Sequence, residues 1–554
     1  MDRPAEGSAR TGMGRRWSRP SRAYGPAVSG EFHASGRSGR ARTLARTTLA
    51  LIGLGVAWRV ARYAACPPLW GDEAFLVVSL LTRDFAGLLG PLEYYQIAPV
   101  GFLWAELAVV RRLGASEWAL RLIPFLSGIA SLLLFDRLAR RLVDRRSALV
   151  AVGIFAASFY PVRHATEVKP YATDLLLSMA ATGLAWSIWL DRESARRWLA
   201  LGALVAAGVW FSYPMVLVAS GLGIALGVRV ASGPSRRGIA LYAAFGLATS
   251  ASWLASYHWA ARPQARFTPL YAELETWRNA FPPLAEPWRL PYWLLDVHTG
   301  NMLAYPNGGN NFASSGTAAL VLAGCLALRK NRPALLALLL APLVPTFLAS
   351  ALHRYPYGTS ARVSLYMAPA FCLLAGVGAV ALIRRLRGGR RPRFYRLAVA
   401  SLVAMMALAS VVNVAWPYKN FEDRENRRAV VELAALTRPG DCWVGFDGLA
   451  ELPPSKKLML EHWLQQMAEV RYNVLARAPV PVRWMPPAGE SLEPPEGRTW
   501  LIVHRSGCPG FDEGRLSRLK MDLGLRLGIP RVHAWPLTLG ESIEAFEFPP
   551  PGGR

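Results

Sequence analysis

Charged residues are scarce in this chain of 554 residues: they make up 18% of it, and acidic residues number 37 against 63 basic ones. Hydrophobic residues, in contrast, make up 53%. Apolar runs recur between about residues 46 and 415, and several approach the roughly 20 residues that cross a bilayer as a helix. This pattern excludes an ordinary soluble enzyme and predicts a polytopic helical membrane protein.

Cysteine is also rare, with five residues and no Cys-x-x-Cys pair. No histidine spacing suits zinc, which argues against the common zinc-binding modules. Cys325 and Cys372 lie in apolar runs, where we expect them only to pack. Cys442 and Cys508 fall in the C-terminal region, and the sequence leaves open whether they pair.

Nucleotide-binding signatures are missing as well. No Gly-x-Gly-x-x-Gly follows an expected strand and no Walker-type lysine loop is present, which disfavours an ATP-driven pump. The net charge of +26 could suggest nucleic acid. The arginines, however, cluster in short loops between apolar runs, as is typical of positive-inside loops. We therefore expect membrane lipids, and no nucleic acid, as partners.

The apolar runs predict eleven spans. They lie near 46–63, 120–140, 148–163, 171–190, 198–213, 214–230, 239–258, 316–329, 333–351, 361–383 and 396–415. The arginine-rich connections fall on every second loop, on the same side as the basic N-terminus, and the positive-inside rule makes that side the cytoplasm. The apolar segment 98–110 is too short to span, so we interpret it as an interfacial or re-entrant helix on the outer face.

Three regions follow from this topology. Residues 1–45 are expected to form a disordered basic cytoplasmic tail, and residues 46–415 the membrane domain. Residues 416–554 are less apolar; DCWVGFDG and TWLIVHR look like strands, and NRRAVVELAAL looks like an amphipathic helix. The expected fold class is an all-α polytopic protein of the inner, cytoplasmic membrane, with a small C-terminal α/β domain outside the cytoplasm.

This topology gathers the unusual polar residues on the outer face. The stretch CPPLWGDEAF, residues 66–75, places Asp72 and Glu73 in the first outer loop. The other candidates are Tyr94, Gln96, Arg163, His164, Glu167, Lys169, Tyr171, Arg354, Tyr357 and Arg362. Arginine or lysine can bind a lipid phosphate and stabilise its charge as a leaving group. A carboxylate can take the proton of an acceptor hydroxyl.

Each of these residues has a simpler interpretation by itself. An acid at a helix end is most often a cap or a solvated loop residue, and arginines and tyrosines anchor helix ends at lipid headgroups. The histidines can make structural hydrogen bonds. Their convergence on the face opposite the basic loops is more informative than any one of them.

Five stretches carry a resemblance to a known family. They are LWGDEAF (69–75), EYYQIAPVGFLW (93–104), LGASEWALRLIPFLSGIASLLLFDRLARRLV (113–143), RHATEVKPYATD (163–174) and YPYGTSARVSLYMAPAF (355–371). In this order they resemble the polyprenyl-phosphate-dependent glycosyltransferases of the GT-C fold. The likeness is greatest to family 39, which includes protein O-mannosyltransferases and the bacterial lipid A aminoarabinose transferase. The specific part of the likeness is 69–175.

The resemblance implies an inverting transfer of a hexose or pentose from a polyprenyl-phosphate donor to a lipid, glycan or protein acceptor on the outer face. It makes Asp72 the acceptor-activating base, supported by Glu73. Lys169 stands where the family has arginine, and it keeps the charge but loses the bidentate fork. Gln96 and Ile97 stand where some relatives have a charged pair. The donor and acceptor specificity of those relatives is therefore not assumed for this chain. We expect the lipid phosphate to be bound by Lys169, Arg163 or Arg354.

A transporter or flippase of lipid-linked saccharides is the main alternative. It would place ionisable residues near the middle of spans and show inverted repeats; Arg59 and Asp174 lie near span ends, and no repeat is found. A membrane scaffold is a third interpretation, and it leaves the acidic pair without a role. The sequence shows no dedicated metal cage, and dependence on a divalent metal stays open.

Overall fold

The computed structural model describes residues 34–93, 96–265, 279–387, 392–415, 422–446, 482–484, 497–505, 512–537 and 542–551. The chain divides into two units, Met1–Ala45 and Arg46–Arg554. Of the first unit, the structure describes only the beginning of helix α1 (Ala34–Ala65), which starts within the segment predicted as a tail. The rest of that predicted tail, Tyr94 and Cys508 lie outside the described residues.

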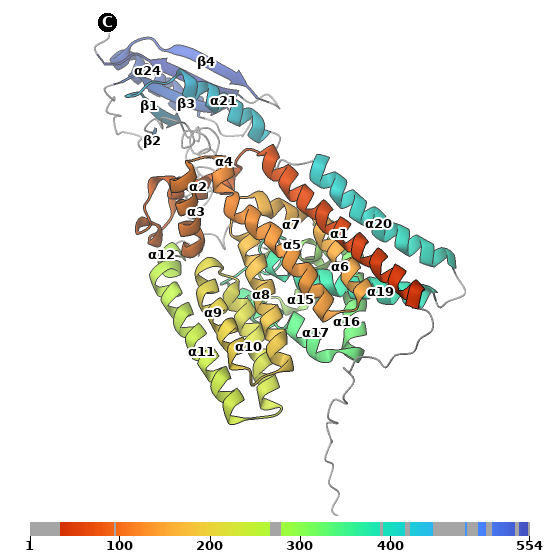
Figure 1. Cartoon of the computed structure of the whole chain (residues 1–554). Coiled ribbons are helices and arrows are strands. Elements are labelled where there is room, and N and C mark those ends of the chain that lie inside the picture. Colours follow the sequence, from red (N-terminus) through yellow and green to blue (C-terminus); the bar gives the residue numbers. More distant parts are fainter. Residues whose placement is uncertain are drawn as a thin grey trace, which may run out of the picture. The chain divides into compact units, whose positions relative to one another are not determined.

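Long apolar helices form most of the structure (Figure 1). Among the described residues, seven helices are long and apolar enough to cross a membrane. They are Arg42–Ala65, Leu122–Leu142, Tyr171–Leu190, Arg236–Gln264, Pro333–Ala351, Leu365–Arg387 and Arg393–Val412. A helix pair bent by 56°, Arg145–Ala157 with Phe159–Thr166, raises the number to as many as eight. The chain is a multi-pass membrane protein, and the count of eleven stays a prediction.

Every predicted span coincides with a helix in the described part of the chain. These helices are α1, α5 (Leu122–Leu142), α6 (Arg145–Ala157), α7 (Phe159–Arg163), α8 (Tyr171–Leu190), α9 (Ala195–Phe211), α10 (Met215–Ala231), α11 (Arg236–Ser256), α16 (Ser315–Asn331), α17 (Pro333–Leu340), α18 (Leu343–Ala351), α19 (Ala368–Arg387) and α20 (Pro392–Ala415). Pro342 separates α17 from α18, because proline cannot continue the helical hydrogen bonds. The predicted span 361–383 begins later, at Leu365, so Arg362 lies in the preceding loop.

Glycine allows α16 and α19 to approach closely. A Cβ on Gly324 of α16 would lie 2.0 Å from the carbonyl oxygen of Leu374, and a Cβ on Gly378 of α19 would lie 1.9 Å from that of Leu320. Such small-residue contacts are typical of helix packing in membranes. In α19, 83% of the apolar window is buried inside the protein. Helix α19 therefore lies in the interior, where it packs against α16, α6, α20 and α8.

Short helices follow the first span. Helix α2 (Gly71–Thr82) packs against α3 (Val100–Leu113) through a cluster of buried leucine, valine and phenylalanine side chains. The 14 residues of α3 leave it outside the set of candidate spans. Pro99 precedes α3, and Gly114, with φ at +84°, ends it in a conformation that favours glycine. The other short helices of the described membrane part are η1 (Gly87–Leu89), α4 (Glu117–Leu120), η3 (His164–Thr166), η4 (Tyr257–Ala261), α12 (Arg262–Gln264), η6 (Pro287–Arg289), α15 (Leu290–Thr299), η7 (Asn301–Leu303) and η8 (Leu365–Met367).

Among the described residues after α20, a five-stranded sheet and two helices are present, which confirms the predicted small α/β domain. The strands are β1 (Cys442–Phe446), β2 (Val482–Trp484), β3 (Thr499–Arg505), β4 (Arg531–Pro536) and β5 (Ser542–Phe548), in the order β2-β1-β3-β5-β4. Strand β1 is parallel to β2 and β3, whereas β5 is antiparallel to β3 and β4. Helix α21 (Glu422–Leu436) packs with Trp443 and helix α24 (Glu513–Leu527) with Val444. Trp443 and Val444, which are adjacent in β1, thus face helices on the two sides of the sheet.

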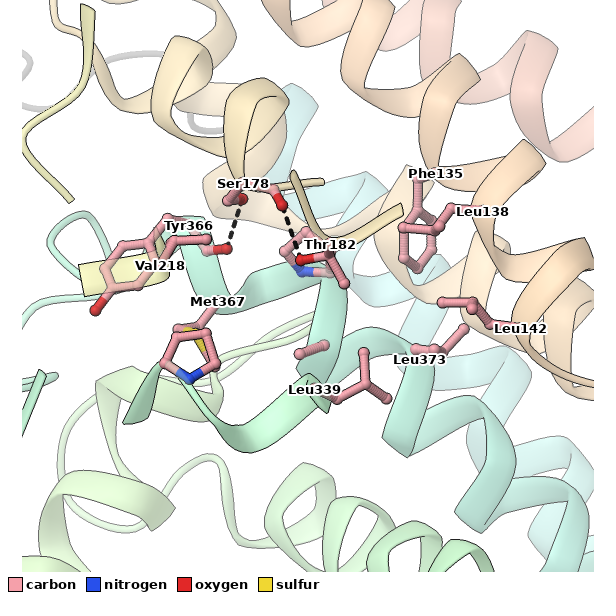
Figure 2. A pocket seen from close by; sticks show the side chains of 13 residues that line it. Phe135, Leu138, Leu142, Ser178, Thr182, Val218, Leu339, Tyr366, Met367 and Leu373 are labelled. Carbon is pink, nitrogen blue, oxygen red and sulfur yellow. Dashed lines mark hydrogen bonds between the residues drawn. The ribbon is translucent and has the colours of Figure 1, made fainter. Parts of the chain in front are cut away.

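One cavity lies deep among the spans (Figure 2). Its volume of about 20 Å³ has room for about one water molecule. Most of its lining is apolar, from α5, α8, α10, α17 and α19. The hydroxyl of Ser178 donates to the carbonyl oxygen of Tyr366, and the hydroxyl of Thr182 donates to the backbone carbonyl oxygen of Ser178. This cavity is too small for a sugar or a lipid headgroup.

Candidate functional site

Asp72 stands in the first turn of α2, where the positive end of the helix dipole favours a carboxylate. Its carboxylate forms an ion pair with Arg362, at 2.5 Å, and both side chains keep a partial exposure of 29% and 21%. The Arg362 guanidinium also lies over the ring of Trp70, 5.7 Å from the centroid. The loop before η8 therefore brings a cation to the acid that the sequence singles out as the base.

Glu73 points the other way, into the protein. Its two oxygens accept from Arg121 Nε at 3.0 Å and from Arg121 Nη2 at 2.7 Å, and both side chains are almost fully buried. The backbone N–H groups of Trp70 and Val168 also donate to this carboxylate. With four donors, Glu73 ties α2 to α5 and to the second outer loop. Its geometry suits the supporting role that the sequence predicts.

The second outer loop builds a triad around the Glu167 carboxylate. The Glu167 carboxylate contacts Arg163 Nε at 2.6 Å and His164 Nδ1 at 2.6 Å. Burial by itself would raise the pKa of Glu167, but the charges of His164 and Arg163 outweigh it and hold the pKa well below its ordinary value. Glu167 is therefore a carboxylate at neutral pH, fully engaged by its own loop.

Lys169 links this loop to the first one. Its Nζ donates to Oε1 of Gln96, at 2.7 Å, and its side chain is buried. Burial lowers the pKa of the Lys169 ammonium below its ordinary value, and the charge of Asp72 offsets only part of that shift. The electrostatic influence of both Asp72 and Arg362 places Lys169 in the same cluster as their ion pair.

Tyr171 completes the cluster at the start of α8. Its phenol interacts electrostatically with Arg362, Asp72 and Glu167. Its ring packs edge-on against His164, with centroids 5.0 Å apart. Nine of the predicted site residues thus meet, directly or through a shared neighbour: Asp72, Glu73, Gln96, Arg163, His164, Glu167, Lys169, Tyr171 and Arg362.

The remaining predicted residues have other surroundings. Tyr357 is buried in an aromatic group with Trp293 and His298, and its hydroxyl lies 3.4 Å from His298 Nε2. Arg354 is exposed, and its backbone N–H donates to the Ala349 carbonyl. Tyr94 lies outside the described residues. The geometry of the cluster thus includes neither Tyr357 nor Arg354.

Two arginines of the site were not singled out from the sequence. Arg121, besides holding Glu73, donates to the carbonyl oxygens of Pro67 and Pro68. Arg62 of α1 is buried, and its Nε donates to the Thr166 hydroxyl at 2.9 Å. A buried arginine needs partners, so a lone arginine at the end of an apolar run is the signal that could have found both.

Among the residues that the structure describes, no three or more His, Cys, Asp or Glu side chains are placed to hold a metal ion.

Comparisons with known proteins give a family match for one segment and the fold. Residues 98–255, less than half of the chain, match the model of the family described as dolichyl-phosphate-mannose-protein mannosyltransferase. The structure of ArnT from Cupriavidus metallidurans in the apo state has a TM-score of 0.50 to this one at 14% identity, over 92% of this chain and 98% of that chain. ArnT bound to undecaprenyl phosphate gives the same TM-score at 13% identity. The chain has the GT-C fold. The resemblance predicted from the sequence is confirmed at the level of this fold and of the matched segment.

An archaeal oligosaccharyltransferase is a more distant neighbour of this GT-C chain. AglB from Archaeoglobus fulgidus, in complex with an inhibitory peptide and a dolichol-phosphate, has a TM-score of 0.46 at 13% identity over 77% of this chain. The chain spans 65% of the length of that protein, and 61% of the length in the complex with Zn and sulfate. No curated protein sequence matches the chain.

Proposed function

We propose that the protein transfers a sugar from a polyprenyl-phosphate donor to an acceptor hydroxyl on the outer face of the cytoplasmic membrane. The observation that carries this proposal is the Asp72–Arg362 pair, 2.5 Å apart and partly exposed, with Lys169 in the same cluster. Few other functions need a carboxylate base beside two cations at the end of spanning helices. The GT-C fold supports the proposal.

Asp72 acts as the general base in this reaction. Its carboxylate takes the proton of the acceptor hydroxyl, and the acceptor oxygen attacks the anomeric carbon of the donor from the face opposite the phosphate. The bond between the anomeric carbon and the phosphate oxygen breaks, and polyprenyl phosphate leaves. The configuration at the anomeric carbon is therefore inverted.

Arg362 and Lys169 bind the phosphate in this mechanism. Both lie within electrostatic reach of Asp72, so a phosphate held by them places the anomeric carbon near the base. Arg163 is engaged by Glu167 through its Nε, and Arg354 is exposed outside the cluster. We propose these two arginines as secondary phosphate contacts, reached only when the donor is bound.

The same proposal covers the substrates and the orientation of the protein in the membrane. The donor sugar is a hexose or a pentose, and the acceptor is a lipid, a glycan or a protein. The N-terminus lies in the cytoplasm and the C-terminal α/β domain outside it. Whether a divalent metal binds together with the donor phosphate is tested by measuring transfer with and without a chelator.

Sugar transfer by wild type and Asp72→Asn tests the proposal. Membranes with either protein receive undecaprenyl phosphate carrying mannose, glucose or aminoarabinose, and transfer to endogenous acceptors is measured. Since the amide keeps the size but cannot take a proton, we expect the variant to lose at least about a hundredfold in rate. Asp191→Asn is the matched control, because Asp191 is an exposed acid paired with Arg197 away from the cluster.

Two results would contradict the proposal. Equal transfer by wild type and Asp72→Asn would remove Asp72 as the base. Absence of transfer by the wild type, with the labelled headgroup still crossing the bilayer, would favour the flippase.

A further inference from the structure

The chain reaches Asp72 through a short connection that is held from both sides. Residues 66–70 join α1 to α2, and Pro67, Pro68 and Leu69 are buried. On the inner side, Arg121 donates to the carbonyl oxygens of both prolines while it holds Glu73. The backbone N–H of Trp70 then donates to Glu73 at the first turn of α2. A shift of this connection therefore moves the beginning of the helix that carries Asp72.

On its other side, the same connection contacts the C-terminal domain. Arg427 of α21 places Nη2 2.5 Å from Oε2 of Glu117, the first residue of α4. Nη1 of the same guanidinium donates to the carbonyl oxygen of Cys66 at 3.3 Å. Glu117 is almost fully buried, whereas Arg427 is 38% exposed. One guanidinium thus binds two segments that are far from it in the sequence.

Cys66 is the point at which these contacts meet. Its thiol lies 3.6 Å from the Glu117 oxygen that Arg427 binds. Its φ of +43° is in the left-handed region, where residues other than glycine are uncommon and strained. Such a conformation persists only where neighbouring contacts impose it. Arg427 and Glu117 supply two of these contacts.

We propose that Arg427 and Glu117 are positioning residues that latch the C-terminal domain onto the 66–70 connection and thereby fix Asp72 for catalysis. The role rests on the proposed function for its catalytic part. Glu117 also lies within electrostatic reach of Arg121 and Glu73, so its carboxylate connects the latch to the pair behind Asp72. A misplacement of catalytic groups by about 1 Å can cost as much as a hundredfold in rate.

Reactivity of Cys66 tests the latch without any assay of transfer. The other four cysteines are replaced by alanine, and labelling by a charged, membrane-impermeant maleimide is timed in the full-length protein. Loss of the latch releases the connection, so Arg427→Gln should raise the labelling rate about tenfold, since local opening exposes the thiol. Arg428→Gln is the matched control on the same helix; Arg428 is 81% exposed and pairs only locally with Glu432. Equal labelling of wild type and Arg427→Gln would overturn the latch.

Steady-state kinetics test the positioning role. With the donor that wild type uses best, Arg427→Gln and Glu117→Gln should each lower kcat about tenfold, because Asp72 is displaced. Both should leave the donor KM nearly unchanged, since Arg362 and Lys169 are intact. The double variant should lose no more than either single one, because both remove the same contact. Arg427→Lys should recover part of kcat, since lysine keeps the charge but not both hydrogen bonds.

The two readouts separate the possible failures. Faster labelling with unchanged kcat would overturn the positioning role. Additive losses in the double variant would do so too, because independent effects do not come from one shared contact. If wild type transferred no sugar, the proposed function would fail and the positioning role with it, while the labelling would still decide whether the latch exists.

Discussion

Asp72 and Glu73 are neighbours in the chain but face different partners. Asp72 meets Arg362 at the partly exposed side of the cluster, whereas Glu73 is enclosed with Arg121. Successive residues in the first turn of a helix point about 100° apart, so one acid can face the site while the next faces the core. This division makes Asp72 available for proton transfer and leaves Glu73 to hold the helix that presents it.

Glu167 gives a prediction for pH dependence. Its pKa is held well below the ordinary value of 4.5 by His164 and Arg163. A depressed pKa contributes stability that is present above the unfolded-state pKa and lost as the pH falls through the folded-state pKa. We therefore expect Glu167→Gln to lower the free energy of unfolding by about 3 kcal/mol at pH 7, and with it the Tm in detergent. Below pH 4.5 the gap should narrow, because the unfolded chain takes up a proton there, whereas the folded carboxylate does so only at still lower pH.

Thermal unfolding at pH 7 and at several lower pH values measures this difference. Glu432→Gln is the control. Glu432 pairs with Arg428 on the surface of α21, and glutamine can still accept the hydrogen bond from Trp535 Nε1, so the Tm should stay unchanged. A Tm gap between wild type and Glu167→Gln that stays constant with pH would show that the carboxylate's charge is not what stabilises the loop.

At the scale of elements, glycine decides how closely α16 and α19 pack. A Cβ at Gly378 would meet the Leu320 carbonyl at 1.9 Å, and a backbone atom cannot turn away as a flexible side chain can. We expect Gly378→Leu to separate the two helices and to destabilise the protein by at least about 3 kcal/mol, the upper end of ordinary overpacking. The drop in Tm in detergent measures this cost.

Gly246 of α11 provides the matched control for this prediction. No heavy atom lies within 4 Å of a Cβ placed there. Gly246→Leu should therefore leave the Tm unchanged or slightly higher, since leucine is the better helix former. Equal Tm values for both leucine variants would mean that the close approach of α16 and α19 contributes little stability.

At the scale of the whole molecule, features set by residues close together in the chain could be predicted from the sequence. Contacts between residues far apart in the chain could not. Apolar runs fix helices locally, so the helical membrane class and the position of Asp72 just past the first span followed from the sequence. The sequence placed Asp72 in a loop, however, whereas the structure places it in the first turn of α2. The Asp72–Arg362 pair joins residues 290 positions apart, and only the packed helices bring them together. The inward turn of Glu73 likewise depends on Arg121, 48 positions away. No local pattern contains either contact.

The predicted sidedness of the chain depends on one short helix. If α3 crossed the membrane, the parity of all later connections would reverse, and its 14 residues are too few for about 30 Å of hydrocarbon at 1.5 Å per residue. Arg112, at the end of α3, should then lie outside, and Glu193, in the arginine-rich connection between α8 and α9, in the cytoplasm. Single cysteines at these two exposed positions, in a cysteine-free chain, report the side through an impermeant maleimide in right-side-out vesicles. We expect Arg112→Cys to be labelled at once and Glu193→Cys only after permeabilisation. The reverse pattern would place Asp72 and Arg362 on the cytoplasmic face, where the proposed outer-face transfer could not occur.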